Sequence, residues 1–517
     1  MSSIPESLLD DLSGLNPPQR EAVTHGDGPL LIVAGAGSGK TAVLTKRISH
    51  LINERQVSPF AILAISFTNK AAGEVKDRVA GLVGPVAQKM WIGTFHSACV
   101  RILRGNIASL GYKSAFTIYD SSDSERLLSF VMKDGNFDPK KIKPSSVLHA
   151  ISRAKDELIT PEMYADRAAH WMDRQIATIY AAYQRRLQEA SALDFDDIIN
   201  LTVRLFREFP EILRHYRERF QHVLVDEFQD TNGAQFELVR LLGAPNGNVT
   251  VVGDMDQSVY GFRGADYRNL ARFEEAFPSA RVITLEQNYR STQRILSAAN
   301  ALIEHNSARK PKNLWTDSGP GDPVVVHLSG NEHDEAAFIA MEIERLRDTE
   351  GYRFRDAAVF YRTNAQSRVI EEIFTRFGIP YRIVGGLRFY DRREVKDLLA
   401  YLRVLVNPAD TVSLRRIVNT PRRGIGDRTI AELEGYAAVS GITLYEAIEG
   451  AEHNPALAKR TLSGLRAFSS LMNELQAYRR DGASVRDIIQ VAWERSGYMA
   501  ELESERSIEA LGRVENL

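Results

Sequence analysis

A glycine-rich segment that ends in lysine and threonine is the part of this sequence with the clearest chemistry. Residues 34–41 read Ala-Gly-Ala-Gly-Ser-Gly-Lys-Thr and follow the apolar run 30–33. Glycines let backbone N–H groups close around a phosphate, and a helix that starts there adds favourable polarity. Lys40 would reach the β- and γ-phosphates of a nucleotide, and Thr41 would bind Mg²⁺. A turn without a ligand is the alternative, but the strand–loop–helix context favours a nucleotide site made by Ala36, Gly37, Ser38, Gly39, Lys40 and Thr41.

Two adjacent carboxylates, Asp226 and Glu227, end another apolar run at 222–225. Asp226 suits Mg²⁺, either as a direct ligand or in the outer coordination sphere. Glu227 suits a general base that positions and activates an attacking water. An acidic pair at a strand end is often only a solvated loop, but a phosphate loop in the same chain favours nucleotide hydrolysis.

Neighbouring residues argue against two other classes of nucleotide-binding protein. A GTPase needs an Asn-Lys-x-Asp sequence to read guanine, but Asn69-Lys70 is followed by Ala71-Ala72. A kinase of small metabolites does not need a second α/β region with an arginine of its own. Neither class fits the chain well.

The residues with chemistry lie at the ends of short apolar runs that are predicted to be strands. The runs are continuous rather than alternating, as expected for strands buried on both faces of a parallel sheet. A helical stretch at 42–53 follows the first run, and this order places ligands at the carboxyl ends of the strands. The runs are 30–33, 61–66, 222–225, 249–252 and 282–285.

Two regions differ from this pattern. Residues from about 96 to 220 read as almost entirely helical and are interpreted as an insertion into the first α/β domain. One amphipathic face there is made by Ile176, Ile179, Tyr180, Tyr183 and Leu187. A second α/β segment has apolar runs at 324–326, 358–361 and 381–384. From about residue 388 the chain is helical again and rich in Arg and Glu.

The composition is typical of a soluble globular protein with several domains. The chain has 517 residues, 44% of them apolar, and its net charge of −2 does not indicate a nucleic-acid partner. A basic groove can still coexist with an acidic surface. The single cysteine, Cys99, excludes an internal disulfide and fits a reducing compartment. There is no signal-peptide pattern and no apolar run near the roughly 18 residues of a spanning helix, so a cytoplasmic, nucleoid-associated bacterial protein or a nuclear protein is expected.

Seven segments, taken in order, resemble the motifs of the UvrD/PcrA/Rep group of superfamily 1 DNA helicases. Any one of them could arise by chance, whereas seven in the family's order could not. The first looks like the adenine-reading motif, and the others look like motifs Ia and Ib, a segment beside the DNA path, and motifs II, III and IV. The segments are 15–19, 66–72, 93–97, 193–197, 225–231, 252–265 and 285–291.

The resemblance implies an α/β fold with two RecA-like P-loop NTPase motor domains. Each would be a parallel sheet flanked by helices with a mainly helical inserted domain, and the second would be incomplete. Residues 1–95 and 196–284 are expected to form the ATP-binding motor domain 1A, and 96–195 its insertion 1B. Residues 285–387 would form motor domain 2A, and 388–517 its truncated insertion 2B.

The resemblance also implies roles at the ATP site. Gln19 would hydrogen-bond the adenine, and Tyr289 would stack on it. Gln257 would sense the γ-phosphate and pass its state along its own loop toward the DNA. Arg290, carried by the second motor domain, would act on the same phosphate as an arginine finger. The expected catalytic residues are Lys40, Asp226, Glu227, Gln257 and Arg290, with Thr41 and Asp226 holding Mg²⁺ and with ATP as the nucleotide.

The expected DNA path combines aromatic side chains with basic and small polar ones at the same motifs. Bases stacked on aromatic faces gain roughly 1–3 kcal/mol each without a sequence preference, and phosphate contacts position the strand. The alternatives are core positions for the aromatics and an ordinary hydrogen-bonding role for His96. A Gly-x-Gly turn at 424–426, beside Arg422 and Arg423, resembles the family's duplex-contacting turn or simply joins two helices. The expected contacts are Phe67, Asn69, Lys70, Thr94, His96, Phe195, Tyr260, Phe262, Arg263, Arg362, Asn364, Gly424 and Gly426.

The family's motifs V and VI and its duplex-splitting hairpin have no counterpart before Leu517, so a truncated chain with weak unwinding is expected. The leading hypothesis is an ATP-dependent helicase that moves 3′–5′ on single-stranded DNA and acts in repair or replication restart. Its partners would be single-stranded DNA, single-strand/duplex junctions and repair proteins, without a membrane, and it would act as a monomer or dimer on DNA. The motor half of a helicase–nuclease and a non-enzymatic, ATP-gated DNA-binding scaffold are the alternatives, and an RNA substrate stays open.

Overall fold

The structure of this chain is a computed structural model that divides into two compact units. It describes residues 12–243, 247–306, 310–384, 392–454 and 459–504, together with residues 390, 457, 514 and 517. The larger unit is built from the described residues of Met1–Gly321 and Asp397–Leu511. The smaller unit is built from those of Asp322–Lys396 and Gly512–Leu517.

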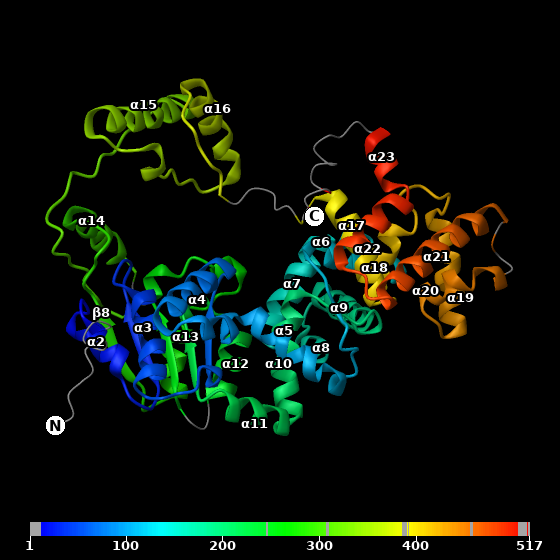
Figure 1. Cartoon of the computed structure of the whole chain (residues 1–517), viewed down its shortest axis with the longest axis horizontal. Coiled ribbons are helices and arrows are strands. Elements are labelled where there is room, and N and C mark those ends of the chain that lie inside the picture. The colour runs from blue at the N-terminus through cyan, green and yellow to red at the C-terminus, as the bar shows by residue number, and fades with distance from the viewer. Residues whose placement is uncertain are drawn as a thin grey trace. The chain divides into compact units, whose positions relative to one another are not determined.

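Six parallel strands form the central sheet of the larger unit, in the order β3-β2-β6-β7-β1-β8 (Figure 1). The strands are β1 (Leu30–Ala34), β2 (Ile62–Ser66), β3 (Trp91–Thr94), β6 (His222–Val225), β7 (Val249–Gly253) and β8 (Arg281–Leu285). All five predicted runs are confirmed as strands, to within one residue at either end. Strand β3 was not predicted, because Trp-Ile-Gly-Thr is short and contains a glycine in place of an apolar side chain.

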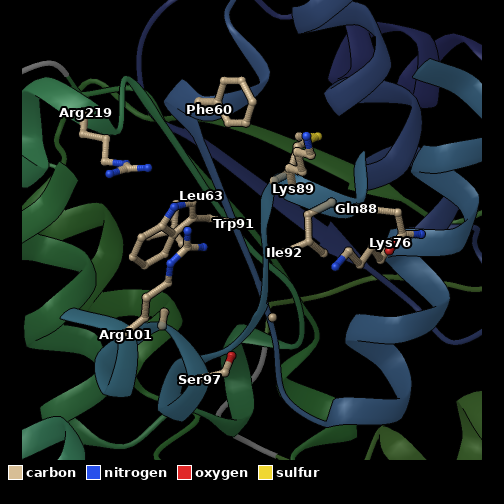
Figure 2. Close-up of a pocket in the computed structure, with 13 residues that line it drawn as sticks. Phe60, Leu63, Lys76, Gln88, Lys89, Trp91, Ile92, Ser97, Arg101 and Arg219 are labelled. Carbon is tan, nitrogen blue, oxygen red and sulfur yellow. The ribbon is translucent and has the colours of Figure 1, made fainter. Parts of the chain in front are cut away.

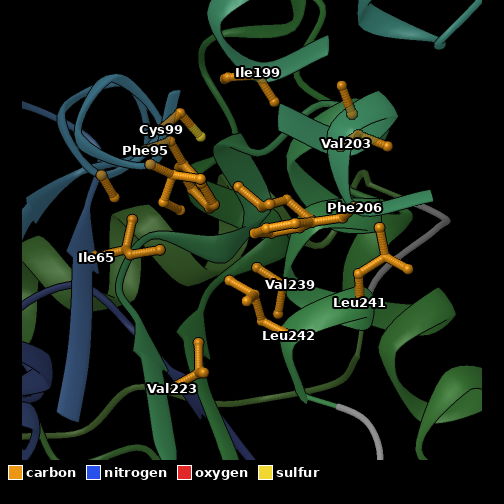
Figure 3. Packing of buried hydrophobic residues seen from close by; sticks show 14 of the residues in the cluster. Ile65, Phe95, Cys99, Ile199, Val203, Phe206, Val223, Val239, Leu241 and Leu242 are labelled. Atoms are coloured by element: carbon orange, nitrogen blue, oxygen red, sulfur yellow. The ribbon is translucent and has the colours of Figure 1, made fainter. Parts of the chain in front are cut away.

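Helices cover both faces of this sheet, which explains why the strands read as continuous apolar runs. Successive residues of a strand point to opposite faces, so Leu31 and Ile32 enter different cores. The core that contains Ile32 is covered by α2 (Pro17–Thr24), α3 (Lys40–Asn53) and α4 (Asn69–Val83). The core that contains Leu31 is covered by α5 (Phe95–Asn106), α10 (Phe195–Glu208), α11 (Pro210–Arg219), α12 (Gly233–Gly243) and α13 (Asn269–Ala276). Figure 3 shows Phe206 of α10 among Val239 and Leu242 of α12 in this second core.

The chain between α5 and α10 forms a helical insertion whose core, distinct from those of the sheet, also contains Val412 from the C-terminal part of the chain. Its helices are α6 (Ser121–Asp134), α7 (Pro144–Asp156), α8 (Pro161–Arg167) and α9 (Trp171–Glu189), joined by a short parallel pair, β4 (Thr117–Ile118) and β5 (Ala192–Leu193). Tyr119, Leu128 and Tyr183 are buried in this separate core. Helix α5 was expected in the insertion, but Ile102 and Leu103 pack against the sheet, so the separate core begins later in the chain.

A buried ion cluster joins the insertion to the sheet. Lys155, near the end of α7, lies 2.7 Å from a carboxylate oxygen of Asp194 and 2.7 Å from one of Asp197. Asp194 caps α10, and its side chain accepts a hydrogen bond from the backbone N–H of Asp197. Burial alone lowers the pKa of Lys155, but the negative charges of Asp194 and Asp197 outweigh burial and hold that pKa well above its usual value. The lysine therefore stays charged and fastens α7 to the start of α10.

The C-terminal part of the chain is helical, as predicted. Its helices are α17 (Arg393–Val406), α18 (Thr411–Ile417), α19 (Asp427–Ser440), α20 (Leu444–Glu449), α21 (Lys459–Arg480), α22 (Val485–Arg495) and α23 (Tyr498–Ser504). Phe468, Met472 and Leu475 of α21 lie at the centre of their shared core. The predicted boundary between 387 and 388 falls outside the described residues. Among the described helices, none has the length and apolar character that a membrane span requires.

The smaller unit contains α15 (Glu332–Glu350) and α16 (Ser367–Phe377), which pack through Ala340 and Phe374. The runs 324–326, 358–361 and 381–384 were predicted as strands, but they form no strand in the described residues. Val326 and Phe360 are 83% and 93% exposed. A strand needs a neighbour to pair its backbone and a layer to cover its side chains, and an apolar run by itself supplies neither.

Replacing Lys155 by Met should destabilise the larger unit by about 3–5 kcal/mol, because Asp194 and Asp197 would lose the cation between them. Urea and thermal unfolding followed by circular dichroism measure the loss. Lys140→Met is the matched control, because the Lys140 side chain is exposed. Equal unfolding midpoints for the two variants would contradict the assignment of a stabilising role to the cluster.

Candidate active site

The loop between β1 and α3 depends on backbone conformations that glycine permits. Gly37 and Gly39 have φ angles of +69° and +85°, in the left-handed region that strains other residues. Gly39 precedes the first residue of α3, and no side chain caps this end of the helix. The N–H groups of the first helical turn therefore remain available, and an anion such as a phosphate is the partner that they and the helix dipole favour.

The three residues assigned to γ-phosphate chemistry meet at the end of this loop. The Nζ of Lys40 donates to Oε2 of Glu227 at 3.0 Å and to Oε1 of Gln257 at 3.0 Å. Lys40 opens α3, Glu227 follows β6, and Gln257 lies in the short helix η5 (Met255–Gln257) after β7. Parallel pairing brings these strands to one edge, so residues far apart in the chain converge.

Asp226 and Glu227 form a carboxylate pair at the end of β6 that favours a nearby cation. Asp226 is buried, and burial together with the charge of Glu227 raises its pKa to about 6. Glu227 has a φ angle of +50°, a strained conformation for a residue with a side chain. Gln229 donates to Glu227 at 2.8 Å and holds its carboxylate in place. With the Thr41 hydroxyl in the first turn of α3, this set of oxygens fits a hard cation such as Mg²⁺.

The residues expected to bind adenine lie beside the same loop. The side chain of Gln19 is buried and donates to the carbonyl of Ser38 at 2.8 Å. The backbone N–H of Tyr289 donates to the carbonyl of Gly37 at 2.9 Å, and its hydroxyl accepts from Asn16 at 3.0 Å. Asn16 caps α2, the helix that carries Gln19. Gln19 and Tyr289 are thus brought together by contacts to one loop.

Arg290 lies just after β8, the last strand of the sheet. β8 pairs with β1, and residues up to Gly321 belong to the larger unit. A Cβ atom placed on Gly37 would lie 2.8 Å from the Cβ of Arg290, so the arginine stands against the phosphate loop. Arg290 is exposed and makes no ion pair with a described residue, which leaves its guanidinium group available for an anion.

Several of the expected DNA contacts form an aromatic and cationic cluster, most of it in the loop that follows β7. The rings of Phe67 and Tyr260 lie 4.7 Å apart, and those of Tyr260 and Phe262 lie 6.1 Å apart. The Arg263 guanidinium lies 5.5 Å from the centres of both the Tyr260 and Phe262 rings. Phe262 is 63% exposed, so a core position is excluded for it. Asn69 and Lys70, two further expected contacts, are exposed in the first turn of α4.

His96 and Phe195 form a second pair, with ring centres 5.2 Å apart. Phe195 is 53% exposed at the start of α10. Burial lowers the pKa of His96, which favours its neutral imidazole. Thr94 also has a structural role, because its hydroxyl oxygen caps α5 by accepting from the backbone N–H of Ser97 at 3.2 Å.

The remaining expected contacts lie elsewhere in the fold. Arg362 and Asn364 are exposed in the smaller unit. Gly424, with a φ angle of +74°, and Gly426 lie in the turn between α18 and α19. Beside this turn, the Arg423 guanidinium donates to the carbonyls of Ile417 and Thr420 at 2.9 and 3.1 Å.

Comparison with known families agrees with this arrangement. Residues 15–278 match the UvrD/REP helicase N-terminal domain, and residues 283–456 match the UvrD-like helicase C-terminal domain. This chain belongs to the UvrD/Rep helicase family. The family resemblance that the seven motifs indicated is thereby confirmed.

Individual members of the UvrD/Rep family align with nearly the whole chain. ATP-dependent DNA helicase UvrD1 of Mycobacterium tuberculosis is 51% identical over 525 residues, which cover 99% of this chain and 67% of the relative. ATP-dependent DNA helicase PcrA of Bacillus subtilis is 47% identical over 506 residues, covering 98% of this chain and 68% of the relative. PcrA of Staphylococcus aureus is 46% identical, with 98% and 69% covered. The chain thus spans about two thirds of the length of these UvrD/Rep relatives.

Two residues that the motif analysis did not single out fasten the site of this UvrD/Rep family member. The ammonium group of Lys312 pairs with Asp254 and Asp256 on either side of Met255, and all three charged side chains are nearly buried. Asp254 in turn accepts from the side chain of Gln257. No periodicity or motif marks Lys312 in the sequence, because its partners lie more than fifty residues away. Gln229, quoted only as part of a motif, joins Glu227 to the backbone N–H of Asp254.

Asn288 links the segment that carries Arg290 to the phosphate loop. Its amide donates to the carbonyl of Ala36 at 2.6 Å and accepts from the backbone N–H groups of Arg290 and Ser291 at 2.8 and 2.7 Å. The side chain is buried, so each of these groups would lose its partner on truncation.

Asn288→Ala should weaken nucleotide binding about tenfold or more, because losing buried hydrogen bonds costs about 1–3 kcal/mol and releases Arg290 from the loop. Titration of a fluorescent ATP analogue measures the affinity, and circular dichroism checks the fold. Arg294→Ala, at an exposed position on α14 (Gln293–Ile303), is the control. Unchanged affinity in Asn288→Ala would refute a positioning role for this amide.

Proposed function

We propose that this chain is the motor of an ATP-dependent DNA helicase that moves 3′–5′ along single-stranded DNA and acts in repair or replication restart. The main support for the proposal is the loop that follows β7. Its residue Gln257 meets Lys40, which also bonds to Glu227, and a few residues later the same loop carries Tyr260 and Phe262 of the aromatic cluster. The names of the UvrD1 and PcrA relatives, both ATP-dependent DNA helicases, support the same activity. We expect weak unwinding by this chain alone, because the described residues of the smaller unit form no strand.

ATP hydrolysis in this proposal uses the groups that already surround the phosphate loop. Lys40 exchanges its bonds to Glu227 and Gln257 for bonds to the β- and γ-phosphates. Release from Lys40 leaves Glu227, still held by Gln229, to orient and deprotonate the attacking water. Thr41 and Asp226 would hold Mg²⁺, which neutralises phosphate charge when bound. Arg290 adds a positive charge at the γ-phosphate, and Gln19 and Tyr289 hold the adenine.

Coupling to DNA follows from the length of the loop after β7. Gln257 contacts Lys40, and Tyr260, only three residues later, contacts Phe67. Asp254, at the start of this loop, is held by Gln229 and Lys312. A movement of Gln257 would therefore displace the later part of the loop rather than Asp254. A γ-phosphate that takes Lys40 from Gln257 therefore shifts the segment that carries Tyr260 and Phe262. ATP binding and hydrolysis would in this way alternately strengthen and weaken the contacts of Tyr260 and Phe262 with stacked bases.

ATP turnover by the whole chain should rise at least tenfold when single-stranded DNA is added, since DNA would stabilise the productive loop position. Glu227→Gln should lose about 100-fold or more of that turnover while keeping nucleotide affinity, because it removes only the general base. A coupled phosphate-release assay and the fluorescent ATP titration provide the two readouts. Glu54→Gln, exposed just after α3, is the control. Equal turnover with Glu227 and with Gln at this position would instead favour a non-enzymatic, ATP-gated scaffold.

Phe262→Ala should weaken single-stranded DNA binding roughly five- to a hundredfold, the range expected for the loss of one stacked base. Val259→Ala is a matched control, because Val259 is an exposed apolar residue on the same loop. Fluorescence anisotropy with a labelled oligothymidine measures both variants without nucleotide. The same oligomer made of RNA tests the substrate class. Equal affinities for the two variants would exclude Phe262 from the strand path.

A further inference from the structure

The outer edge of β3 borders a groove that the proposed function does not use. β3 ends the sheet and pairs only with β2 among the described strands, so one side of its backbone has no ladder partner. A cavity of about 550 Å³ lies along this edge. Its walls include Phe60 before β2, Gln88 and Lys89 before β3, and Trp91 and Ile92 of β3 itself (Figure 2).

Four cations line this groove, and no acidic side chain does. They are Lys76 of α4, Lys89, Arg101 of α5 and Arg219 at the end of α11. None of the four forms an ion pair with a described residue, although the net charge of the whole chain is −2. Positive charge is therefore concentrated here without compensation, which attracts an anionic partner.

The groove also contains polar donors that lack acceptors. The indole Nε1 of Trp91 and the Nε of Arg219 are buried without a hydrogen-bond partner. Trp91 is only 6% exposed, and the guanidinium groups of Arg101 and Arg219 lie 4.0 and 5.1 Å from its ring centre. Figure 2 shows both guanidinium groups directed toward the indole. Cations alone can simply protect a sheet edge against aggregation. Buried donors without acceptors have no such use, and the Trp91 and Arg219 side chains that carry them line the groove.

We propose that this groove is a docking site for an extended acidic segment of a partner protein, which adds a strand to the outer edge of β3. Backbone groups of the segment would pair with residues 91–93, because Ser97 already bonds to the backbone N–H and carbonyl of Thr94. Its carboxylates would face Lys89, Arg101 and Arg219. This mode combines main-chain hydrogen bonds, which give affinity, with charge pairs, which give selectivity and speed association.

The position and surface of the groove favour a peptide over a nucleic acid. The groove runs from Phe60 and Gln88 at the amino ends of β2 and β3 to Gly93 and Ser97 near the carboxyl end of β3, so only this last part adjoins expected DNA contacts. The Trp91 ring is covered by guanidinium groups and core side chains, so no base can stack on it. An unpaired strand edge presents both N–H donors and C=O acceptors, which matches the backbone of an extended peptide, whereas phosphate oxygens can only accept.

The test uses a short fluorescent peptide of alternating glutamate and threonine, titrated by anisotropy against the whole chain. Arg101→Glu and, separately, the exposed Lys89→Glu should each weaken peptide binding at least about tenfold, because each reverses a charge in the groove. The matched control is Arg214→Glu, an exposed arginine on α11 outside the groove, which should leave binding unchanged. Affinity for oligothymidine and DNA-stimulated turnover should also stay unchanged in both groove variants.

A second peptide, N-methylated at alternate residues, separates strand addition from simple charge attraction. It keeps every carboxylate but cannot donate along one edge, so its affinity should fall at least about tenfold. Equal binding of the two peptides, or no binding of either, would overturn the proposal. Loss of oligothymidine binding in Arg101→Glu and Lys89→Glu, with peptide binding unaffected, would instead assign the groove to nucleic acid. Because oligothymidine affinity is read separately, failure of the helicase proposal would be distinguishable from failure of this one.

Discussion

Burial of both faces of a six-stranded parallel sheet is the constraint on which the rest of this structure depends. Helices close off both faces, so polar side chains can reach a ligand only from the strand ends and the sheet edges. Parallel pairing then places the carboxyl ends of β1, β6 and β7 together, and with them Lys40, Glu227 and Gln257. The same rule carries Phe67 and Thr94 to the ends of β2 and β3, beside the nucleotide residues but on different strands.

Lys40 is the residue through which a nucleotide would act on this arrangement in the proposed function. Its ammonium group bonds to Glu227 and Gln257, which are themselves held by Gln229 and Asp254. Lys312 completes the network by pairing with Asp254 and Asp256. Because these groups are partly or fully buried, each lost partner must be replaced. In the proposed reaction, phosphate oxygens accept from Lys40 in place of Glu227 and Gln257, and a water molecule donates to the released Glu227 carboxylate. The edge groove of β3 follows from the same sheet, because the last strand on that side keeps an unpaired backbone.

The sequence predicted the elements that local patterns encode. Continuous apolar runs identified five of the six strands of the main sheet, and Gly-Lys-Thr after the first of them predicted a phosphate-binding role for the loop between β1 and α3. The pattern was too weak for β3, where Gly93 interrupts an already short strand. At 324–326 and 358–361 the pattern was present but the strands were not, because pairing depends on neighbours rather than on the run itself. Helix α5 is a further example. Its apolar face predicted a buried helix but not whether it would pack against the sheet or within the insertion.

The sequence by itself determined the chemistry available to this protein: a phosphate loop, a carboxylate pair, a glutamine, and aromatic residues in the order of the UvrD/Rep family. These signals are local in the sequence or occur in a recognisable order along it, so they can be read without a structure. Only the tertiary structure decided that Arg290 stands against the loop through the pairing of β8 with β1, and that Lys312 and Lys155 hold distant segments through buried charge. It also decided that four scattered cations share one groove. Such contacts join residues tens to hundreds of positions apart, and the folding of the chain, not the spacing of its residues, sets those distances.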